Sequence, residues 1–154
     1  MPNTNHQIYL QFVFAVKFRY ALIPKQNKEE IHKYLTGLVQ HRNAKMLAVH
    51  CMPDHCHLFV GYHPAKHIPD FVKEVKNESN EFINQRRLSR GKFAWQEGYG
   101  VFSYSRSQID SVIKYVNNQE IHHRKKTFRE EYLQLLQKFN VDFDEKYLFD
   151  FITV

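Results

Sequence analysis

The spacing of apolar residues along the first half of the chain predicts strands separated by a helix. Residues 6–19, HQIYLQFVFAVKFR, are rich in Ile, Val, Phe and Tyr and predict a first strand. Apolar residues recur at helical spacing in residues 25–43, so we expect a helix there. Residues 44–62 predict two strands, and Pro53 and Asp54 between them are typical of a tight turn.

The second half of the chain continues this alternation and ends in helices. Residues 68–87 have the apolar spacing of a helix, with Pro69 in its first turn. Residues 99–105, YGVFSYS, predict a fourth strand. Residues 107–126 and 128–140 predict a third and a fourth helix. The predicted order of elements is therefore β-α-β-β-α-β-α-α.

This order predicts an α+β, ferredoxin-like (RRM-like) fold. The first six elements have the split βαβ arrangement, in which an antiparallel sheet carries helices on one face. We expect the opposite face to be open to a ligand, a partner or a second subunit. The 154 residues fit a single domain, residues 1–154. Within it we expect a core unit of residues 6–126, followed by a C-terminal helix and an acidic, aromatic tail in residues 127–154.

The charge of the chain is unevenly distributed. The formal net charge is +6, yet residues 127–154 hold three basic and six acidic residues, which leaves nineteen basic and ten acidic residues in the remainder. A basic body of this kind suits a polyanionic partner, for which nucleic acid is the usual choice. A solvated basic surface has the same composition, so charge alone leaves both interpretations open.

The length of the apolar runs and the number of cysteines argue against a membrane protein and against a disulfide-rich one. The chain has no run of about 18 apolar residues, and its N-terminus lacks the regions of a signal peptide. We therefore expect a cytoplasmic protein that does not enter a membrane. The two cysteines, Cys51 and Cys56, argue against a disulfide framework.

Two histidines lie one residue apart in the sequence MPDHCHLFV. On a strand, His55, His57 and Phe59 share one face, while Cys56 lies on the other. The two imidazoles are then about 7 Å apart along the strand, close enough for their ring nitrogens to bind one cation. Because the chain has 10 histidines, one such pair is about as likely as not to arise by chance, so the motif needs support from elsewhere.

The predicted turn also fixes what lies across the hairpin. With Pro53 and Asp54 at the centre of the turn, Cys51 falls opposite Cys56. A structural zinc site made from both cysteines and both histidines would need side chains from both faces of the sheet, and its spacing matches no standard zinc module. We therefore expect the cysteines to be buried thiols.

The third predicted helix offers side chains that could complete a site. Its apolar residues form a stripe at the spacing i, i+3, i+4, i+7, and Tyr115 and Gln119 lie one turn apart on one flank of that stripe. Both side chains could reach a site on a neighbouring strand. Alternatively, Tyr115 lies at the edge of the core and Gln119 is solvated.

Taken together, these motifs resemble the single-tyrosine HUH transposases of bacterial insertion sequences, including REP-associated enzymes. The resemblance rests on PDH-x-HL, on WQEGYGVFSYS (residues 95–105), and on Y-x-x-x-Q about sixty residues after the histidines. It extends from His6 to about Glu131. HUH denotes His-hydrophobe-His, and Cys56 takes the place of the hydrophobe as a small apolar side chain.

The resemblance implies a function for each matching residue. His55, His57 and Gln119 match the metal ligands of the family, and Tyr115 matches its nucleophile. Family members cut and rejoin single-stranded DNA through a 5′-phosphotyrosine intermediate and recognise hairpins near the ends of their element. They use a divalent metal, for which Mg²⁺ or Mn²⁺ suits phosphoryl transfer. The resemblance also implies a homodimer in which the tyrosine helix can complete the partner's site.

Two other functions stay open at this point. The chain could be a non-catalytic nucleic-acid-binding protein, a domesticated or decayed transposase on the same fold. It could also be a small metalloprotein without nucleic acid, although its basic body argues against this. All four matched catalytic positions are filled, which favours the transposase.

Basic and aromatic residues suggest where DNA would bind. Arginines interleaved with aromatic residues suit phosphate contact and base stacking, although a solubilising loop would have the same composition. The candidate contacts are Lys17, Arg19, Arg86, Arg87, Arg90, Lys92 and Trp95.

Overall fold

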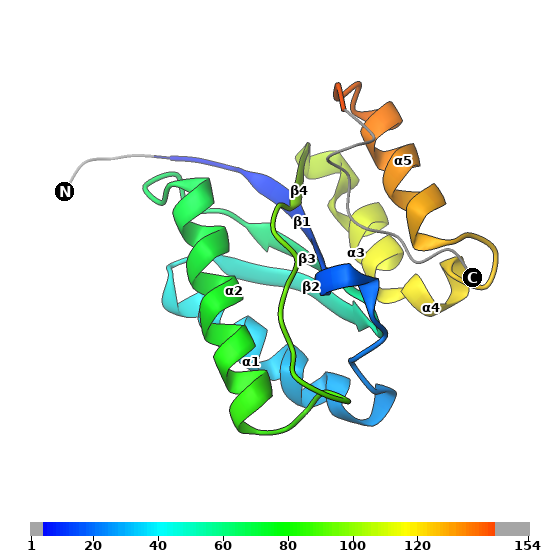
Figure 1. Cartoon of the computed structure of the whole chain (residues 1–154). Coiled ribbons are helices and arrows are strands. Elements are labelled where there is room, and N and C mark those ends of the chain that lie inside the picture. Colours follow the sequence, from blue (N-terminus) through cyan, green and yellow to red (C-terminus); the bar gives the residue numbers. More distant parts are fainter. Residues whose placement is uncertain (1–4, 144–154) are drawn as a thin grey trace.

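The computed structural model describes residues 5–143, and these contain one four-stranded antiparallel sheet (Figure 1). The strands are β1 (Tyr9–Ala15), β2 (Lys45–Met52), β3 (His55–Gly61) and β4 (Gly100–Tyr104). They lie side by side in the order β2-β3-β1-β4. This is the sheet order of the ferredoxin-like fold, and it confirms the predicted fold class. The end of the predicted tail, residues 144–154, lies outside the described residues.

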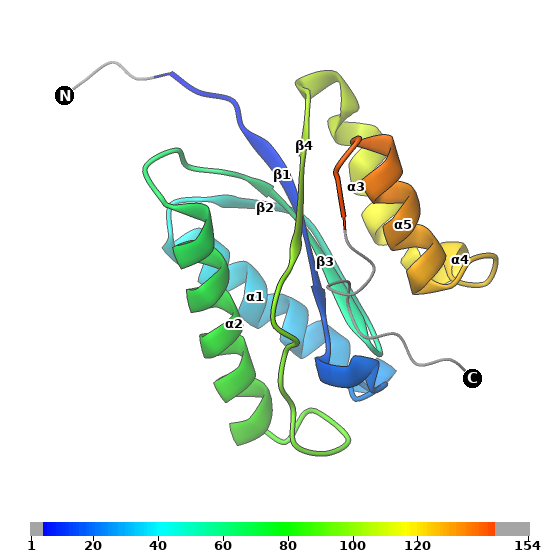
Figure 2. The same cartoon turned by 45° about the horizontal axis from the view of Figure 1, so that its top comes forward.

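Two helices cover one face of the sheet, as predicted (Figure 2). They are α1 (Lys28–His41) and α2 (Ile68–Gln85), and a short 3₁₀ turn, η2 (Lys25–Asn27), leads into α1. Alternate residues of β1, Phe12 and Phe14, are fully buried against this layer. No helix within residues 5–143 is long and apolar enough to cross a membrane.

The opposite face is covered as well, which corrects the expectation of an open face. It carries α3 (Ile109–Asn117), α4 (Gln119–His122) and α5 (Phe128–Lys138) (Figure 2). The reason lies in β1, whose residues between Leu10 and Ala15 are apolar except for Gln11 and are buried on both faces. Such a strand must be covered on both sides, because exposing a row of apolar side chains to water is unfavourable.

The side chains on this second face form two apolar clusters. One joins residues of β1 and β4 to α5, and the other joins residues of β2 and β3 to α3. The first cluster contains Val13, Ala15, Phe102, Phe128, Tyr132, Leu135 and Leu136. The second contains Ala48, Phe59, Val112 and Val116.

The helix predicted over residues 107–126 is broken. A 3₁₀ turn, η3 (Arg106–Gln108), precedes α3, and the chain leaves helical geometry at Asn118, whose φ is −102° and ψ is 24°. The hydrogen-bond ladder resumes beyond the break, where the His122 amide donates to the Asn118 carbonyl. The predicted side chains Tyr115 and Gln119 therefore belong to two short helices, and Gln119 is the first residue of α4.

The β2–β3 hairpin has the predicted register. Residues 53 and 54 form its turn, Cys51 pairs with Cys56, and His50 pairs with His57. Both cysteines are free and buried in the α1–α2 layer, with their Sγ atoms 3.0 Å apart. The histidines of β3 therefore face α3 and α5, and the thiols pack on the other side of the sheet, as the alternation predicted.

The docking of α5 depends on a glycine in β4. A Cβ atom added at Gly100 would lie 2.6 Å from the hydroxyl oxygen of Tyr132 and 2.8 Å from its ring carbon Cε1. Tyr132 is buried between Phe102 and Phe128 and has little room to move. We expect Gly100→Ala to lower the free energy of unfolding by about 1–3 kcal/mol, measured by urea denaturation.

A matched control is available in α1. Gly37 is exposed in a helix, and a Cβ atom there would contact nothing within 4 Å. Gly37→Ala should therefore raise the free energy of unfolding by about 0.5–1 kcal/mol. If Gly100→Ala unfolded at the same urea concentration as the wild type, the close approach of α5 to β4 would be wrong.

Candidate metal centre and active site

The two histidines of β3 are buried between the sheet and α5, and the Nδ1 atom of each has a hydrogen-bond partner. Both are buried, at 1% exposed for His55 and 0% for His57, and their ring centroids are 5.2 Å apart. The Nδ1 of His57 lies 2.7 Å from Oε1 of Gln11, and the Gln11 amide in turn donates to the Tyr104 hydroxyl. Because the carbonyl oxygen can only accept, Nδ1 carries the hydrogen and Nε2 is left with a lone pair.

His55 is fixed in the same way by Asp54 from the hairpin turn. Its Nδ1 lies 2.7 Å from Oδ1 of Asp54, so Nδ1 again carries the hydrogen. Burial opposes ionisation of Asp54, but His55 and Arg19 outweigh it and hold the pKa of the carboxyl at about 2. The ring of Phe128 stacks on the other side, with its centroid 3.9 Å from that of His55.

Arg19, predicted to contact DNA, has a different position. Its guanidinium pairs with Asp54 and lies over the ring of Phe128, 4.5 Å from the centroid. The side chain is only 10% exposed. It is placed by a 3₁₀ turn, η1 (Lys17–Arg19), that follows β1 where the predicted strand was expected to continue. Arg19 therefore supports His55 through Asp54, and its contact with DNA stays a prediction.

The free lone pairs of the two histidines point to one carboxylate. Oε1 of Glu131 lies 3.1 Å from Nε2 of His57 and 3.8 Å from Nε2 of His55. The Nε2 atom of His55 is buried and has no hydrogen-bond partner. Burial lowers the pKa of His55 to about 4 even though Asp54 opposes the shift, so the ring is neutral near pH 7. In neutral rings, two lone pairs facing a carboxylate oxygen repel it unless a proton or a metal ion lies between them.

These three groups fit a divalent metal. The ligand atoms of His55, His57 and Glu131 all lie within 4.8 Å of one another. Ligand atoms at about 2.1 Å from an ion and about 90° apart would be about 3 Å from each other. The 3.1 Å between Oε1 of Glu131 and Nε2 of His57 matches this spacing, and the other ligand atoms would move closer together on binding an ion. The carboxylate suits Mg²⁺ and Mn²⁺, and the two imidazoles suit Mn²⁺ and softer transition metals.

Glu131 was missed by the sequence reasoning. It belongs to α5 and is only 4% exposed. An acidic residue in the first turn of a helix usually lies at the surface, where it interacts favourably with the helix dipole. The sequence alone suggests this role for both Glu130 and Glu131. The available signal was its position three residues after Phe128, which places a carboxylate within the apolar stripe of α5 instead of on its solvent side.

Glu131 also binds the predicted nucleophile. The Tyr115 hydroxyl donates to the second carboxylate oxygen, Oε2, and the tyrosine ring lies edge-on to His57. Burial raises the pKa of Tyr115 well above its ordinary value, and the charge of Glu131 raises it further. Burial favours protonation of Glu131 too, but His57 and His123 overcome this and hold the pKa of its carboxyl well below its usual range. One carboxylate thus connects the histidine pair to the tyrosine.

Gln119 reaches the same site through His123. The Nε2 of His123 lies 3.1 Å from Oε1 of Gln119 and 3.2 Å from Oε1 of Glu131, so its N–H donates to both oxygens. Gln119 is fully buried, and its amide donates to the main-chain oxygen of Tyr115. The predicted ligands and nucleophile therefore meet in one place, with Gln119 one side chain further from the histidines than Glu131. His123, the residue that follows α4, therefore belongs to this network.

The other candidate DNA contacts divide by exposure. Lys17, Arg86, Arg87, Arg90 and Lys92 are exposed, and their role stays a prediction. Trp95 is only 8% exposed, packs against Phe14 and Phe93, and donates from Nε1 to Ser79. Trp95 is therefore part of the core, and the stacking of a base on it stays a prediction.

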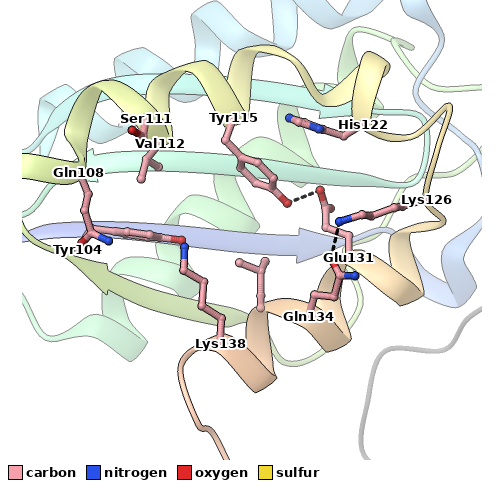
Figure 3. A pocket seen from close by; sticks show the side chains of 11 residues that line it. Tyr104, Gln108, Ser111, Val112, Tyr115, His122, Lys126, Glu131, Gln134 and Lys138 are labelled. Atoms are coloured by element: carbon pink, nitrogen blue, oxygen red, sulfur yellow. Dashed lines mark hydrogen bonds between the residues drawn. The ribbon is translucent and has the colours of Figure 1, made fainter.

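A cavity of about 490 Å³ opens beside the site, between α3 and α5 (Figure 3). Tyr115 and Glu131 form one end of it, so the tyrosine hydroxyl can be approached from this side. Tyr104 and Lys138 line the other end. The cavity therefore opens next to Tyr115, the predicted nucleophile.

Comparisons with known sequences point to one family. The family model described as "Transposase IS200 like" matches residues 4–119. The chain is 24% identical over 119 residues to the ISDra2 transposase TnpA of Deinococcus radiodurans, covering 74% of this chain and 85% of that protein. It is 22% identical over 122 residues to the transposase for insertion sequence element IS200 of Salmonella typhimurium, covering 75% and 80% of the two chains.

Two solved structures share the fold. A crystal structure of a candidate transposase from Deinococcus radiodurans R1 has a TM-score of 0.59 at 23% identity, over 77% of this chain and 95% of that one. The structure of a REP-associated tyrosine transposase bound to a REP hairpin has a TM-score of 0.57 at 12% identity, over 94% and 93% of the two chains. The 94% coverage extends past residue 119 into the region of α5. The predicted resemblance is confirmed, and the chain belongs to the IS200-like transposase family.

Proposed function

We propose that the chain cuts and rejoins single-stranded DNA, with Tyr115 as the nucleophile and a divalent metal, Mg²⁺ or Mn²⁺, held by His55, His57 and Glu131. One observation carries the proposal. The buried Nε2 of His55 has no partner and faces a carboxylate whose other oxygen accepts from the Tyr115 hydroxyl. A cation-binding site and a nucleophile therefore share one side chain, which is the arrangement that metal-assisted attack on a phosphate needs.

The chemistry follows from what each group can do. The Tyr115 oxygen attacks the phosphorus of the scissile phosphate, a P–O(Tyr) bond forms, and the bond to the 3′ oxygen breaks. The phenolic proton has an acceptor in the Glu131 carboxylate, and the departing 3′ oxygen takes up one proton, from Glu131 or from solvent, and is released as a hydroxyl. When bound, the metal would polarise the phosphate and offset the charge that builds on its oxygens. In rejoining, a 3′-hydroxyl attacks the phosphotyrosine and releases Tyr115, so no external energy source is needed.

The choice of DNA as the substrate rests on the family, on the basic body of the chain, and on a relative. One solved relative is a transposase bound to a REP hairpin, and by analogy we propose a hairpin with single-stranded flanks as the substrate here. The alternative, a non-catalytic nucleic-acid-binding protein on the same fold, is disfavoured by the buried histidines and tyrosine, which a decayed site would have no reason to keep aligned.

Two residues are candidates for the third metal ligand. The resemblance implies Gln119, whereas Glu131 is closer to the histidines and carries the charge. Gln119 would reach the same ion only if His123 released its side-chain oxygen. We therefore propose Glu131 as the third ligand and Gln119 as the side chain that orients His123 against it. The site draws all of these groups from one chain, and homodimer formation stays a separate prediction.

A covalent-adduct assay tests the activity. The protein is incubated with a labelled hairpin and its single-stranded flanks, taken from DNA next to its own gene, with Mg²⁺ or Mn²⁺, and resolved on a denaturing gel. We expect a metal-dependent protein–DNA adduct that is lost in Tyr115→Phe, because the phenylalanine has no nucleophile. Tyr20→Phe, at a tyrosine that is 53% exposed, should form the adduct normally.

Each other outcome of this assay has a definite meaning. Hairpin binding without an adduct across several flanking sequences would favour the non-catalytic DNA-binding protein. The absence of both binding and adduct would contradict a role with DNA. An adduct that persists in Tyr115→Phe would contradict the assignment of the nucleophile.

Metal titration distinguishes the two ligand sets. Without DNA, we expect Mn²⁺ to bind the wild type and to raise its thermal midpoint, because a ligand of the native state stabilises it. His57→Ala should abolish this shift, and Glu131→Gln should weaken binding by about 10–100-fold, measured by isothermal calorimetry. Glu130→Gln, one residue away on the exposed side of α5, should bind like the wild type.

The opposite result is equally clear. If Glu131→Gln bound Mn²⁺ normally while Gln119→Leu did not, the ligand set implied by the resemblance would hold. Glu131 would then be only a hydrogen-bond partner of Tyr115.

A further inference from the structure

The cavity between α3 and α5 has the charge of a phosphate-binding site. Two lysines line it, Lys126 near Glu131 and Lys138 near Tyr104 (Figure 3). Among residues 5–143, neither lysine forms an ion pair: Lys126 donates to Oε1 of Gln134 at 2.5 Å, and Lys138 lies 5.8 Å from the centre of the Tyr104 ring. Of the described residues that line the cavity, Glu131 alone is a carboxylate, and it is already bound by His57, His123 and Tyr115. The cavity therefore presents net positive charge to a ligand.

The remaining walls suit a nucleobase. Val112 and Leu135 provide apolar surface, and Gln108 and Gln134 stand at the exposed rim with amide nitrogens that can donate. The oxygen atoms of both carboxamides are occupied, that of Gln108 by Ser105 and that of Gln134 by Lys126. A volume of about 490 Å³ is in the range of small-molecule sites and accommodates one nucleotide.

The position of the nucleophile connects this cavity to the reaction. The Tyr115 hydroxyl and Glu131 form one end of the cavity, so a phosphate within reach of Tyr115 lies at that end (Figure 3). The nucleotide attached to this phosphate then extends either along the cavity or away from it. The positive charge of the two lysines favours the path along the cavity. Apolar walls, amide donors and cations within one opening are the combination by which proteins bind single-stranded DNA.

We propose that this cavity binds a nucleotide next to the scissile phosphate, with the adjoining phosphates on Lys126 and Lys138 and the base between Val112 and Leu135. This rests on the proposed function, because the DNA strand is identified by the nucleophile at the end of the cavity. The cavity would set where along the strand Tyr115 cuts, separately from the hairpin that anchors the DNA.

The test compares two DNAs and matched variants by fluorescence anisotropy in EDTA, where no cleavage occurs. One DNA is the hairpin with its single-stranded flanks, and the other is the hairpin alone. We expect Lys126→Gln and Lys138→Gln each to weaken binding of the flanked hairpin and to lower its salt slope by about 0.7, the value for one lost single-strand phosphate contact. Lys125→Gln, whose exposed lysine does not line the cavity, should leave that slope unchanged.

A blocking variant tests the space itself without removing charge. Ser111 stands exposed at the rim, and Ser111→Trp should weaken binding of the flanked hairpin roughly tenfold while leaving the hairpin alone unaffected. Asn117→Trp places the same ring on α3 outside the cavity and should bind both DNAs normally. All five side chains are exposed, and circular dichroism melts confirm that each variant is folded before binding is measured.

The outcomes separate this inference from the proposed function. If the wild type forms the covalent adduct but the cavity variants bind the flanked hairpin normally, the cavity proposal is overturned and the strand-transfer proposal stands. If the variants lose affinity for the flanks but the wild type forms no adduct, the cavity stands as a nucleotide site and strand transfer is overturned. If the wild type does not distinguish the two DNAs, the cavity proposal fails whatever the adduct assay gives.

Discussion

The carboxylate of Glu131 is the group on which the arrangement of this molecule depends. Burying an ionised carboxylate costs several kcal/mol unless partners replace the water it loses. Here Tyr115 from α3, His123 from the α4–α5 connection and His57 from β3 surround it. These partners come from three separate parts of the chain, so the carboxylate is satisfied only when all three are docked on the same face of the sheet. The active site and the packing of the second helical layer are therefore one structure.

The apolar contacts of α5 bring that carboxylate to its place. Phe128 lies flat on His55, and Tyr132 fits over Gly100 because the glycine leaves room for its ring. Phe128 is in turn covered by Arg19, which also holds Asp54 against His55. Packing and hydrogen bonding thus support the same imidazole from two sides. A change far from the histidines that shifts α5 would move the metal ligand, even with every ligand residue intact.

The sequence predicts some of these features better than others. The hairpin register was predictable, because strict alternation places His55 and His57 on one face and a two-residue turn leaves a single pairing of Cys51 with Cys56. The first six elements were predictable because each is either a helix with regular apolar spacing or a short run rich in β-branched and aromatic residues. The covered second face was less so, although the continuous apolar run of β1 was a sign that both of its faces are buried.

Features that depend on partners from distant parts of the chain were not predictable in this way. The burial of Glu131 and His123 follows from the docking of α5, and no local pattern specifies which helix covers which face. The burial of Trp95 and Arg19 was not predictable for a similar reason. An aromatic or a guanidinium group looks the same in sequence whether it meets DNA or, as here, Phe14 and Asp54. The resemblance to transposases found Tyr115 and Gln119 because it draws on two motifs at once.

The net charge of the proposed metal centre depends on whether Glu131 or Gln119 is its third ligand. Two neutral imidazoles and a carboxamide would leave a divalent ion with its full charge of +2, whereas exchanging the carboxamide for Glu131 leaves +1. The weaker net charge would attract a phosphate less strongly at the ion itself. The two lysines of the neighbouring cavity, Lys126 and Lys138, lie where they would make up that difference along the DNA strand. Under the proposed function, attraction for the DNA would therefore be divided between the ion and the cavity, which would favour DNA placed correctly along the cavity over phosphate bound at the metal alone.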